Sequence, residues 1–394
     1  MGVKIVEVRT GRERKAFVKL PFSIYKGNPY WIPPLIRSAV NDIDPAVNPF
    51  FKGCDAKFWM AYKNGKIMGR IGAIIHHPHN AKTGERFGRI TRPEFFDDAE
   101  VVDALFQTAE NWIREQGMEA VVGPLGFSNV DTQALLVEGF DQLPSVASVY
   151  HLPYYQSHFE RLGYKKLIDW VEFNLYLEPE VPEKAVRLSK LVKERYGFTV
   201  EEMKSQEMLR ANGKDFFRIF NTAFNDLFSF TAFDDAQVEY VLDNYLSVIN
   251  PEFVHIVRNE NHEMVGAIIP VPSLSRAMQK ADGRLWRGLP AIIRSRKKNN
   301  IIDLFLTGVL PEYQPKGVAS LLIAETYPVM VKYGMITVDT TGMLENNQKA
   351  IQNWKQYSHE QNKRKRCYIK YFDEKKQTAL GTYVGEDCQS DDKE

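Results

Sequence analysis

The chain has 394 residues, of which 44% are hydrophobic, and its formal net charge at pH 7 is +1. That length accommodates two or three domains, and a near-neutral charge argues against nucleic acid as a partner. The three cysteines are too far apart for a metal site or a disulfide framework, which favours a reducing, cytoplasmic setting.

The N-terminal half, residues 1–178, begins with a strand-like alternation rather than the apolar core of a signal peptide. Asn64 and Gly65 tolerate positive φ, so they predict a hairpin turn between strands 58–62 and 67–75. No apolar run is long enough for a membrane-spanning helix, so stable membrane insertion is not expected. The later elements are predicted as helix 98–116 with Asp97 as its N-cap, strand 119–123, helix 155–162 and strand 170–177.

The C-terminal half follows an acidic, proline-containing linker at 178–183. Residues 373–394 at its end are acidic and polar, which predicts a disordered tail. The elements expected between them are helices 183–196 and 213–225, hairpin strands 253–257 and 264–271, strand 301–306, a helix ending near Tyr333, strand 336–339, helix 347–357 and strand 367–371.

The order hairpin, helix, strand, helix, strand occurs in both halves. We therefore predict two tandem modules, at 1–178 and 179–372, followed by the tail at 373–394. Each module is expected to be α/β, with a mixed sheet and helices on both of its faces.

Residues 309–319 read V-L-P-E-Y-Q-P-K-G-V-A and carry the clearest functional signal. They lie between an apolar run and the segment S-L-L-I-A-E, which predicts a strand, a short turn and the start of a helix. The first N–H groups of a helix lack partners and the helix dipole adds positive potential, so this turn would bind an anion. Gly317 would let a ligand come close to the backbone.

The pattern Gln314-x-x-Gly317-x-Ala319 resembles the Q/R-x-x-G-x-G/A signature of the GNAT superfamily of acyl-CoA N-acyltransferases. Residues 28–35 (N-P-Y-W-I-P-P-L) and 48–51 (N-P-F-F) are similar to a bacterial subfamily of two-module GNAT-like proteins without assigned substrates. The resemblance extends over most of residues 15–372 and implies the GNAT fold in both modules.

The resemblance also implies a site for acetyl-CoA or another acyl-CoA as co-substrate. In the family, the turn holds the pyrophosphate of coenzyme A, and pantetheine lies in a gap beside the preceding strand. Here the implied pantetheine contacts are the backbone groups of Val309 and Leu310, and an N–H near Val309 would stabilise the oxyanion. The implied pyrophosphate contacts are Gln314, Lys316, Gly317, Val318, Ala319 and Ser320. Pro315 removes one amide from this turn, while Lys316 adds a positive charge.

A second signature, L-E-N-N-Q-K-A at 344–350, resembles the N-x-x-A of the family and assigns Asn347 to the cofactor arm. The alternative is that Asn346 or Asn347 is only the N-cap of the next helix. Seven residues after Asn347, where many family members have a tyrosine acid, this chain has Trp354, whose indole cannot donate a proton at neutral pH. Tyr357 is the nearest substitute, although a packing role is an alternative.

Attack by an amine also requires a base. Asp303, Asp339 and Glu345 are candidates on or after the strands that would open toward the cleft. Glu345 is the first choice because it lies beside the cofactor asparagine. For each of them the alternative is a structural carboxylate in a hydrogen bond or salt bridge.

Three other segments bear on function. Residues 76–80 (H-H-P-H-N) lack matching ligands elsewhere, so we expect a loop without a metal, although a role in substrate binding stays open. Residues 89–98 of the N-terminal module place acids at a helix start and lack the glycine motif, so we expect no coenzyme A there. Residues 273–300 carry eight basic residues and one acid between apolar positions. This insertion could meet an anionic acceptor, the adenosine 3′-phosphate or a membrane surface, or pack as a solvated helical pair.

The sequence therefore predicts direct transfer of an acetyl or other acyl group from coenzyme A to an amine of a small metabolite or amino acid. The missing tyrosine leaves open a module that binds coenzyme A without turnover. A Fem-type aminoacyl transferase, which would use charged tRNA, is a third hypothesis that the neutral charge disfavours. A homodimer is compatible with all three.

Overall fold

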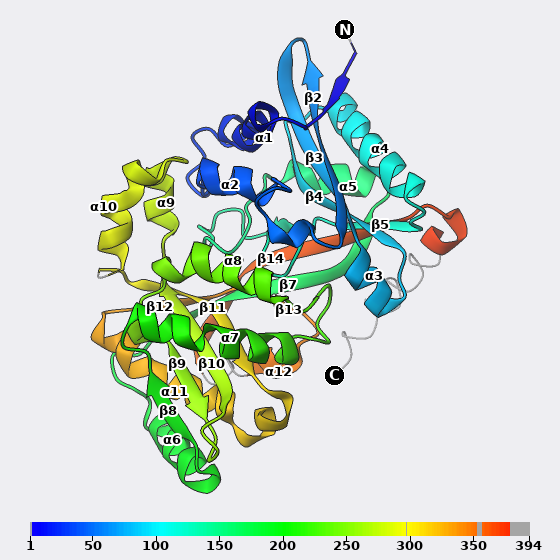
Figure 1. The fold of residues 1–394 in the computed structure, drawn as a ribbon. Coiled ribbons are helices and arrows are strands. Elements are labelled where there is room, and N and C mark those ends of the chain that lie inside the picture. The colour runs from blue at the N-terminus through cyan, green and yellow to red at the C-terminus, as the bar shows by residue number, and fades with distance from the viewer. Residues whose placement is uncertain (1, 297, 353–356, 379–394) are drawn as a thin grey trace, which may run out of the picture. The chain divides into compact units, whose positions relative to one another are not determined.

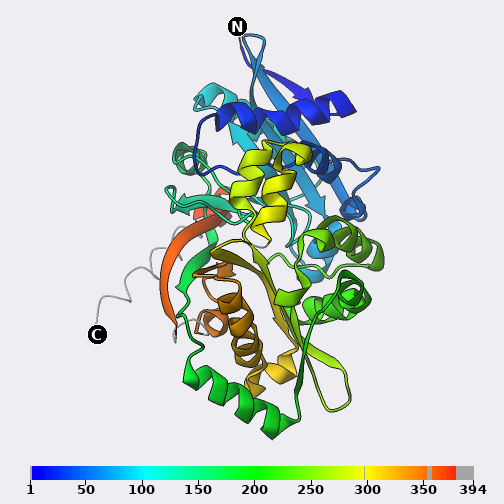
Figure 2. The ribbon, with the colours of Figure 1, turned by 90° about the vertical axis from the view of Figure 1, so that its left-hand side faces the viewer.

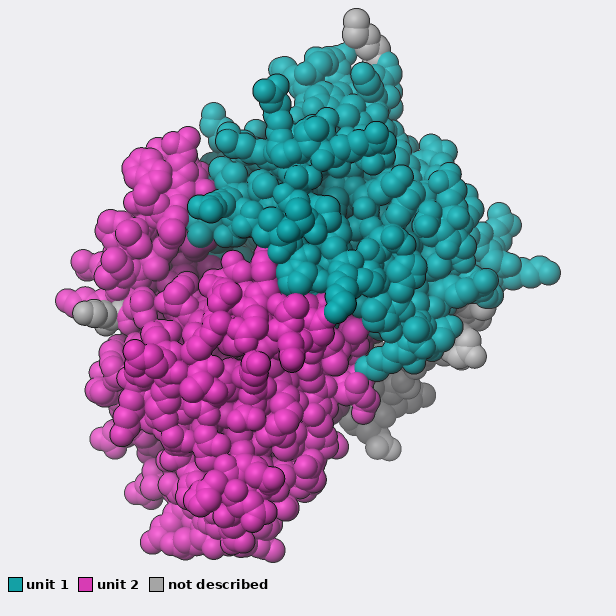
Figure 3. Space-filling model, viewed as in Figure 1, with its two compact units in different colours: residues 1–144, 148–170, 363–394 teal, residues 145–147, 171–362 magenta. Residues whose placement is uncertain are grey.

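The computed structural model of the chain describes residues 2–296, 298–352 and 357–378. The chain divides into two compact units, which Figure 3 colours separately. Unit 1 contains residues 1–144, 148–170 and 363–394, and unit 2 contains residues 145–147 and 171–362. The long strands β7 (Lys165–Tyr176) and β14 (Ser358–Tyr371) therefore supply residues to both units, whereas we had predicted modules that are continuous in sequence.

Unit 1 is built on a sheet with the strand order β1-β2-β3-β4-β5-β14 (Figure 1). The first four strands are antiparallel neighbours, whereas β4 and β5 run parallel. On β3, Gly69 faces Leu105 of α4, and the next residue, Arg70, donates to the Phe17 carbonyl of α1. Because successive strand residues point to opposite faces, α1 and α4 cover opposite sides of this sheet. The elements are β1 (Lys4–Glu7), α1 (Gly11–Ile24), α2 (Ile36–Asp42), β2 (Cys54–Lys63), β3 (Lys66–His76), α3 (His77–Thr83), β4 (Phe87–Phe95), α4 (Ala99–Glu115), β5 (Ala120–Gly123), β6 (Leu135–Glu138) and α5 (Tyr154–Arg161).

Unit 2 has a sheet with the strand order β7-β12-β11-β10-β9-β8. β11 runs parallel to β12 and antiparallel to β10. On its two faces, Gly266 of β10 meets Val318 of α11, while Gly308 of β11 meets Ile219 of α7. The elements are α6 (Glu183–Tyr196), β8 (Thr199–Glu202), α7 (Gln206–Ala223), α8 (Asp235–Tyr245), β9 (His255–Arg258), β10 (Met264–Pro272), α9 (Ser275–Ala281), α10 (Leu285–Ser295), β11 (Ile301–Val309), α11 (Val318–Lys332), β12 (Thr337–Thr340), β13 (Met343–Leu344) and α12 (Gln348–Gln352). Short 3-10 turns lie at Pro49–Phe51 in unit 1 and at Leu246–Val248, Pro251–Phe253 and Pro311–Lys316 in unit 2.

The predicted α/β class with mixed sheets is confirmed, and the same order recurs in both units. In unit 1, β2, β3, β4, α4 and β5 follow one another as β9, β10, β11, α11 and β12 do in unit 2. The predicted hairpin turn is also present, because Asn64 and Gly65 have φ values of 52° and 75°. The N-cap of α4 is Asp98 rather than the predicted Asp97, since the Asp98 side chain accepts the N–H of Val101.

Three predictions at the level of elements need correction. The histidine segment is not a loop, because His76 ends β3 and the residues after it form α3. The predicted helix 347–357 is helical at 348–352, residues 353–356 lie outside the described residues, and β14 starts at Ser358. Within the predicted disordered tail, residues 374–378 are helical and 379–394 lie outside the described residues.

The early start of β14 has an electrostatic cause. Residues 358–366 are polar and basic, so they show none of the apolar alternation that predicts a strand. Within unit 1, the buried carboxylate of Asp169 accepts hydrogen bonds from Arg366 at 2.8 Å and from Arg364 at 3.2 Å. These pairs hold a charged segment in the sheet where its composition alone would not.

Candidate functional site

The parallel strands β11 and β12 of unit 2 separate after a short ladder. Their register begins at Ile301 with Thr337 and ends at Leu304 with Thr340. The pairing of β11 with β10 also skips Phe305, because Pro270 lies opposite Leu304 and Ile269 opposite Leu306. A bulge therefore lies at the point where β12 leaves β11. The hydroxyl of Thr341 donates to the carbonyl of Leu304 at 2.9 Å, just beyond the last pair.

Beyond the bulge, β11 presents backbone groups on the side that β12 has left. The N–H of Leu310 donates to the carbonyl of Val265, its direct partner on β10, at 3.0 Å. In an antiparallel ladder such hydrogen-bonded pairs alternate with pairs whose N–H and C=O groups point outward. By this alternation, Val309 and Thr307 direct their N–H and C=O groups away from β10, toward the open side.

Thr307 lies on the same outward edge and was not among the residues predicted from the sequence. Its side-chain hydroxyl oxygen is buried and has no hydrogen-bond partner among the described residues. Its position two residues before Val309, on the same side of the strand, is the signal that could have identified it.

The open edge leads into the predicted turn and helix. A 3-10 turn at Pro311–Lys316 brings the chain to Gly317, which has a φ of 78° and is the N-cap of α11. No side chain caps this helix, and its first intrahelical bond is from the N–H of Leu321 to the carbonyl of Gly317. The N–H groups of Val318, Ala319 and Ser320 therefore have no acceptor within the helix. The structure thus contains the predicted helix N-terminus, with its positive end next to the open edge of β11.

Gln314 and Lys316 have contacts that the sequence analysis did not foresee. The side-chain amide of Gln314 donates to the carbonyl of Val309 at 3.2 Å, so it binds the outward backbone edge. The ammonium of Lys316 lies 4.4 Å from the centre of the Tyr313 ring. A cation–π contact of this kind holds the lysine at the turn.

The backbone of Leu310 does not have the predicted freedom. Its N–H is bonded to Val265, and its carbonyl accepts the N–H of Tyr313 at 2.9 Å. Both main-chain groups are therefore occupied by the sheet and the turn. Of the two residues predicted to hold pantetheine, only Val309 presents its backbone outward.

The two strand carboxylates occupy equivalent positions on neighbouring strands. Asp303 of β11 is directly paired with Asp339 of β12, so their side chains lie on the same face of the sheet. Both are buried, and Asp303 is only 1% exposed. The hydroxyl of Ser145 donates to Asp303 at 2.9 Å. The pair lies one residue before the strands separate.

Glu345 and Asn347 follow β12 in the segment that begins with Thr341. The Asn347 side chain accepts the N–H of Ala350 at 3.2 Å, which makes it the N-cap of α12. Its oxygen is therefore used within the helix, which was the alternative interpretation of the motif. Glu345 is half-buried and lies four positions after Thr341. A chain of that length places the Cα of Glu345 within about 14 Å of the Cα of Thr341, whose hydroxyl contacts the bulge.

Tyr357 lies near the opposite end of β12. Its ring is stacked on Tyr327 of α11, with the ring centres 6.4 Å apart. The Tyr327 hydroxyl in turn contacts the backbone N–H and carbonyl of Glu178, just beyond the end of β7. Because Tyr176 of β7 pairs with Thr337, this contact lies at the start of β12, whereas the bulge lies at its end. The structure does not bring Tyr357 to the open edge, and Trp354 lies outside the described residues.

In unit 1 the residues after β5 bind back to β4 just beyond its ladder with β5. β4 and β5 are parallel from Phe87 with Ala120 to Arg89 with Val122. After this ladder, the N–H of Leu125 donates to the carbonyl of Ile90 at 2.8 Å. One backbone bond therefore ties the residues after β5 to β4, as the Thr341 hydroxyl ties the residues after β12 to β11.

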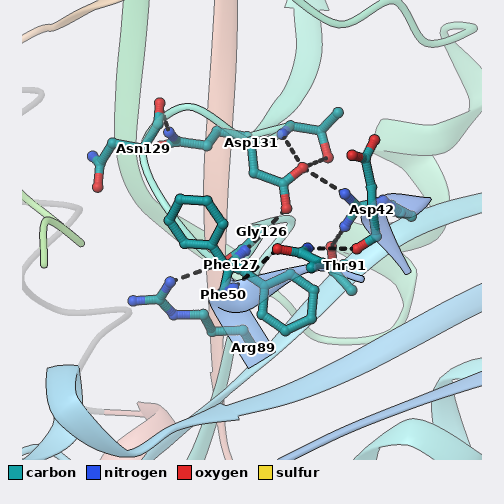
Figure 4. A network of polar contacts seen from close by, with 12 residues as sticks. Asp42, Phe50, Arg89, Thr91, Gly126, Phe127, Asn129 and Asp131 are labelled. Atoms are coloured by element: carbon teal, nitrogen blue, oxygen red, sulfur yellow. Dashed lines mark hydrogen bonds and ion pairs between the residues drawn. The ribbon is translucent and has the colours of Figure 1, made fainter. Parts of the chain in front are cut away.

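Figure 4 shows how side chains hold the segment that follows β5. The guanidinium of Arg89 donates to the carbonyl of Gly126 at 2.9 Å, and the carboxylate of Asp131 accepts the N–H of Phe127 at 3.1 Å. Asp131 also accepts a bond from Arg92 at 2.5 Å. At the start of α4 stands the carboxylate of Asp98, bonded to Lys63 at 2.6 Å. Unit 1 thus has a carboxylate where unit 2 has uncapped amides.

The histidines of unit 1 show structural contacts. The Nδ1 atom of His76 accepts the N–H of His79 at 3.2 Å, and burial lowers the pKa of His76 to about 3. No group of three or more His, Cys, Asp or Glu side chains within the described residues could hold a metal ion. Among the described residues, no helix has both the length and the apolar composition that crossing a lipid bilayer requires.

Two known proteins are related to this chain in sequence. No protein-family model matches the chain. Protein YghO of Escherichia coli strain K12 is 27% identical over 368 residues, which cover 90% of this chain and 92% of that protein. The bacterial ceramide synthase of Caulobacter vibrioides is 27% identical over 298 residues, which cover 72% of this chain and 73% of that protein.

Solved structures agree on the fold at low sequence identity. A tandem GNAT protein from the clavulanic acid biosynthesis pathway has a TM-score of 0.53 and 10% identity, with 94% of this chain and 98% of that chain covered. A probable N-acyltransferase from Enterococcus faecalis has a TM-score of 0.52 and 7% identity, with 94% of this chain and 73% of that chain covered. The chain therefore has a two-module GNAT-like fold, that of the GCN5-related N-acetyltransferases.

Proposed function

We propose that the chain is an N-acyltransferase that moves an acetyl or other acyl group from acyl-CoA directly to an amine. The observation that carries this proposal is the continuity of the open edge of β11 with the uncapped amides of α11. An extended, amide-containing arm that ends in a pyrophosphate matches this arrangement, because the edge offers strand-like hydrogen bonds and the helix start favours anions.

The pyrophosphate would contact the N–H groups of Val318, Ala319 and Ser320. Gln314 borders the same turn, and Lys316 could exchange its contact with Tyr313 for the phosphates. Pantetheine would run along the edge of β11 toward the bulge, bonded to the N–H of Val309, whose carbonyl Gln314 already binds, and to the backbone of Thr307. The strand from Val309 back to Leu304 spans about 17 Å at 3.4 Å per residue, so the thioester would lie near the bulge.

The N–H of Thr307 is the candidate oxyanion donor. It lies on the outward edge of β11, closer to the bulge than the N–H of Val309. Because a backbone N–H in a strand is already fixed in place, it need not reorient when negative charge develops on the carbonyl oxygen. The acceptor nitrogen would add to the thioester carbonyl and form the new C–N bond, which places the negative charge on the carbonyl oxygen. Collapse of this oxyanion would then break the C–S bond. The coenzyme A thiolate would leave with the electron pair, while a base would take the proton from nitrogen.

We assign the base role to Glu345 rather than to Asp303. A base must return its proton to solvent, and Glu345 is half-buried, whereas Asp303 is almost fully enclosed and bonded to Ser145. Asp303 would then position the end of β11. Asn347 would position the start of α12, which its side chain caps. A dedicated acid is not required in this scheme, because a thiolate is a fair leaving group and water can protonate it afterwards.

We propose that unit 1 does not bind a second coenzyme A. The carboxylate of Asp98, which caps α4, supports this assignment. A carboxylate at the start of α4 would repel a phosphate from the amides that it already caps.

The acceptor predicted from sequence is an amine of a small metabolite or amino acid. One of the curated relatives is a ceramide synthase, and a ceramide is an N-acylated long-chain amino alcohol. This relative favours a long-chain amine as a second candidate acceptor for the same reaction.

The proposal is tested by incubating the full chain with acetyl-CoA and with long-chain acyl-CoA against a panel of amines, and following thiol release. The panel includes amino acids, small amines and long-chain amino alcohols. Amine-dependent thiol release with a mass shift on the amine is expected. Binding of coenzyme A by calorimetry without turnover would favour the binding module, and binding of aminoacyl-tRNA would favour the Fem-type alternative.

A further inference from the structure

Helix α10 exposes an apolar stripe. Four large apolar side chains are exposed on it, namely Leu285 (52%), Trp286 (70%), Leu289 (47%) and Ile293 (54%). At 100° per residue these positions fall within one 100° sector of the helix. Isolated exposed apolar residues are ordinary, but four on one face of a single helix form a continuous patch.

The rest of α10 is anchored by α9. Figure 2 shows the two helices as an adjacent pair, drawn in yellow. A Cβ atom at Gly288 would lie 2.5 Å from the Cβ of Ala281 and 3.1 Å from the carbonyl oxygen of Ala277. The backbones are therefore in close contact on this side, and the stripe is not the face by which α10 packs on α9.

Exposed basic side chains lie on the same hairpin, outside the stripe. Arg284, Arg287 and Arg294 are exposed on α10, and Arg276 and Lys280 are exposed on α9. The only acid in residues 273–300, Asp282, is paired with Arg287 at 3.0 Å. By helical geometry Arg287 and Arg294 lie about 80–100° beyond the edge of the stripe that holds Trp286. The hairpin thus combines an apolar face with a positive flank.

We propose that the α9–α10 hairpin docks on the surface of an anionic phospholipid bilayer, with α10 parallel to the membrane plane. Leu285, Leu289 and Ile293 would enter the boundary between headgroups and acyl chains. Trp286 would lie at the level of the headgroups, where indole rings are favoured. The arginines at the flank would meet lipid phosphates. This surface role goes beyond the proposed acyl transfer and does not depend on it.

Charge complementarity selects a lipid surface over the other occupants. A second copy of the hairpin would bring two positive flanks together, which opposes pairing of α10 with itself. A bilayer that contains acidic lipids offers both an apolar interior and negative phosphates. It therefore satisfies the stripe and its flank at once.

Flotation of the full chain with vesicles tests the proposal. We expect binding to phosphatidylcholine mixed with phosphatidylglycerol, weaker binding to phosphatidylcholine alone, and release at high salt. The double variant Leu289→Glu/Ile293→Glu should lose vesicle binding. Because each basic residue near a membrane is worth roughly fivefold in partitioning, Arg284→Gln/Arg294→Gln should weaken binding roughly 25-fold on anionic vesicles.

The matched control is Val186→Glu/Leu191→Glu on α6, where both residues are 55% exposed. It adds the same charge at equally exposed apolar positions, so vesicle binding should stay at the wild-type level. Thermal unfolding midpoints verify that all variants fold. The proposal is overturned if the wild-type chain does not float, if the α10 double variant still floats, or if the α6 control loses as much binding. It is equally overturned if light scattering shows a dimer in solution that only the α10 variant dissociates, since a second copy would then cover the stripe.

Discussion

The hydroxyl of Thr341 donates to the carbonyl of Leu304 at 2.9 Å, at the last paired position of β11 and β12. A weaker contact of 3.3 Å reaches the next carbonyl, that of Phe305. The two carbonyls thus point to the same side, as a bulge requires. One side chain therefore ties the bulge to the segment that leads to Glu345.

We expect Thr341→Val to disturb the place where β11 and β12 separate, with only a small loss in the stability of the chain. Loss of one such hydrogen bond lowers the free energy of unfolding by about 0.5–1.5 kcal/mol. The bulge and the proposed oxyanion donor would shift, so kcat should fall more than the affinity for coenzyme A. Thr341→Ser keeps the hydroxyl and should retain both. Equal kinetics for the valine and serine variants would remove Thr341 from the site.

Gly317→Leu should abolish binding of coenzyme A while the chain stays folded. A side chain at a φ of 78° costs about 1–2 kcal/mol, and a Cβ there would lie 3.3 Å from Val192. Displacing the phosphates from two backbone amides would weaken binding roughly 100-fold, on the order of 1.5 kcal/mol for each charge-assisted bond. Calorimetry with coenzyme A measures this loss.

The control for that variant is Gly334→Leu, beyond the other end of α11. Gly334 has a φ of 70°, and a Cβ atom at this position would meet open space, so the backbone strain is similar. Its unfolding midpoint should fall by a comparable amount, but its affinity for coenzyme A should not change. If both variants bind coenzyme A alike, the anion site is not at Gly317.

Tyr357→Phe should leave turnover within about threefold of wild type, because general acids contribute typically 10²–10⁴-fold. The stacking on Tyr327 places this hydroxyl at the start of β12, away from the open edge. Rates with a saturating amine measure the effect. A drop in turnover by a factor of about 100 or more would return Tyr357 to the role of acid.

The sequence alone predicted the parts of this site that depend on local rules. Gly317 at positive φ and the uncapped start of α11 follow from glycine chemistry and helix periodicity. The occupied backbone of Leu310 and the outward groups of Thr307 depend on the register with β10, which involves residues some forty positions earlier. The length of β14 was underestimated for a similar reason. Its arginines pair with Asp169, which lies almost two hundred residues away in the sequence.

The stability of the chain should fall as the pH is lowered below 6.5, because two buried histidines of unit 1 are held neutral. Burial, aided by the positive charges of Lys365 and Arg70, lowers the pKa of His151 to about 3, and that of His76 is lowered similarly. The Nδ1 atom of His151 accepts the N–H of Leu136 at 3.2 Å, which a proton there would prevent. The unfolded chain binds these protons near pH 6.5, so protonation favours unfolding from that pH down to about 3.

Each histidine should lower the free energy of unfolding by about 2 kcal/mol between pH 8 and pH 5. His151→Gln keeps an acceptor for the N–H of Leu136 but cannot be protonated. The free energy of unfolding, measured with urea, should therefore differ between pH 8 and pH 5 by about 2 kcal/mol less in this variant than in wild type. His77→Gln changes an exposed histidine and serves as the control, because it leaves the His151 site unchanged. If His151→Gln and wild type lose the same stability between pH 8 and pH 5, then His151 takes up its proton in the folded chain and burial does not hold it neutral.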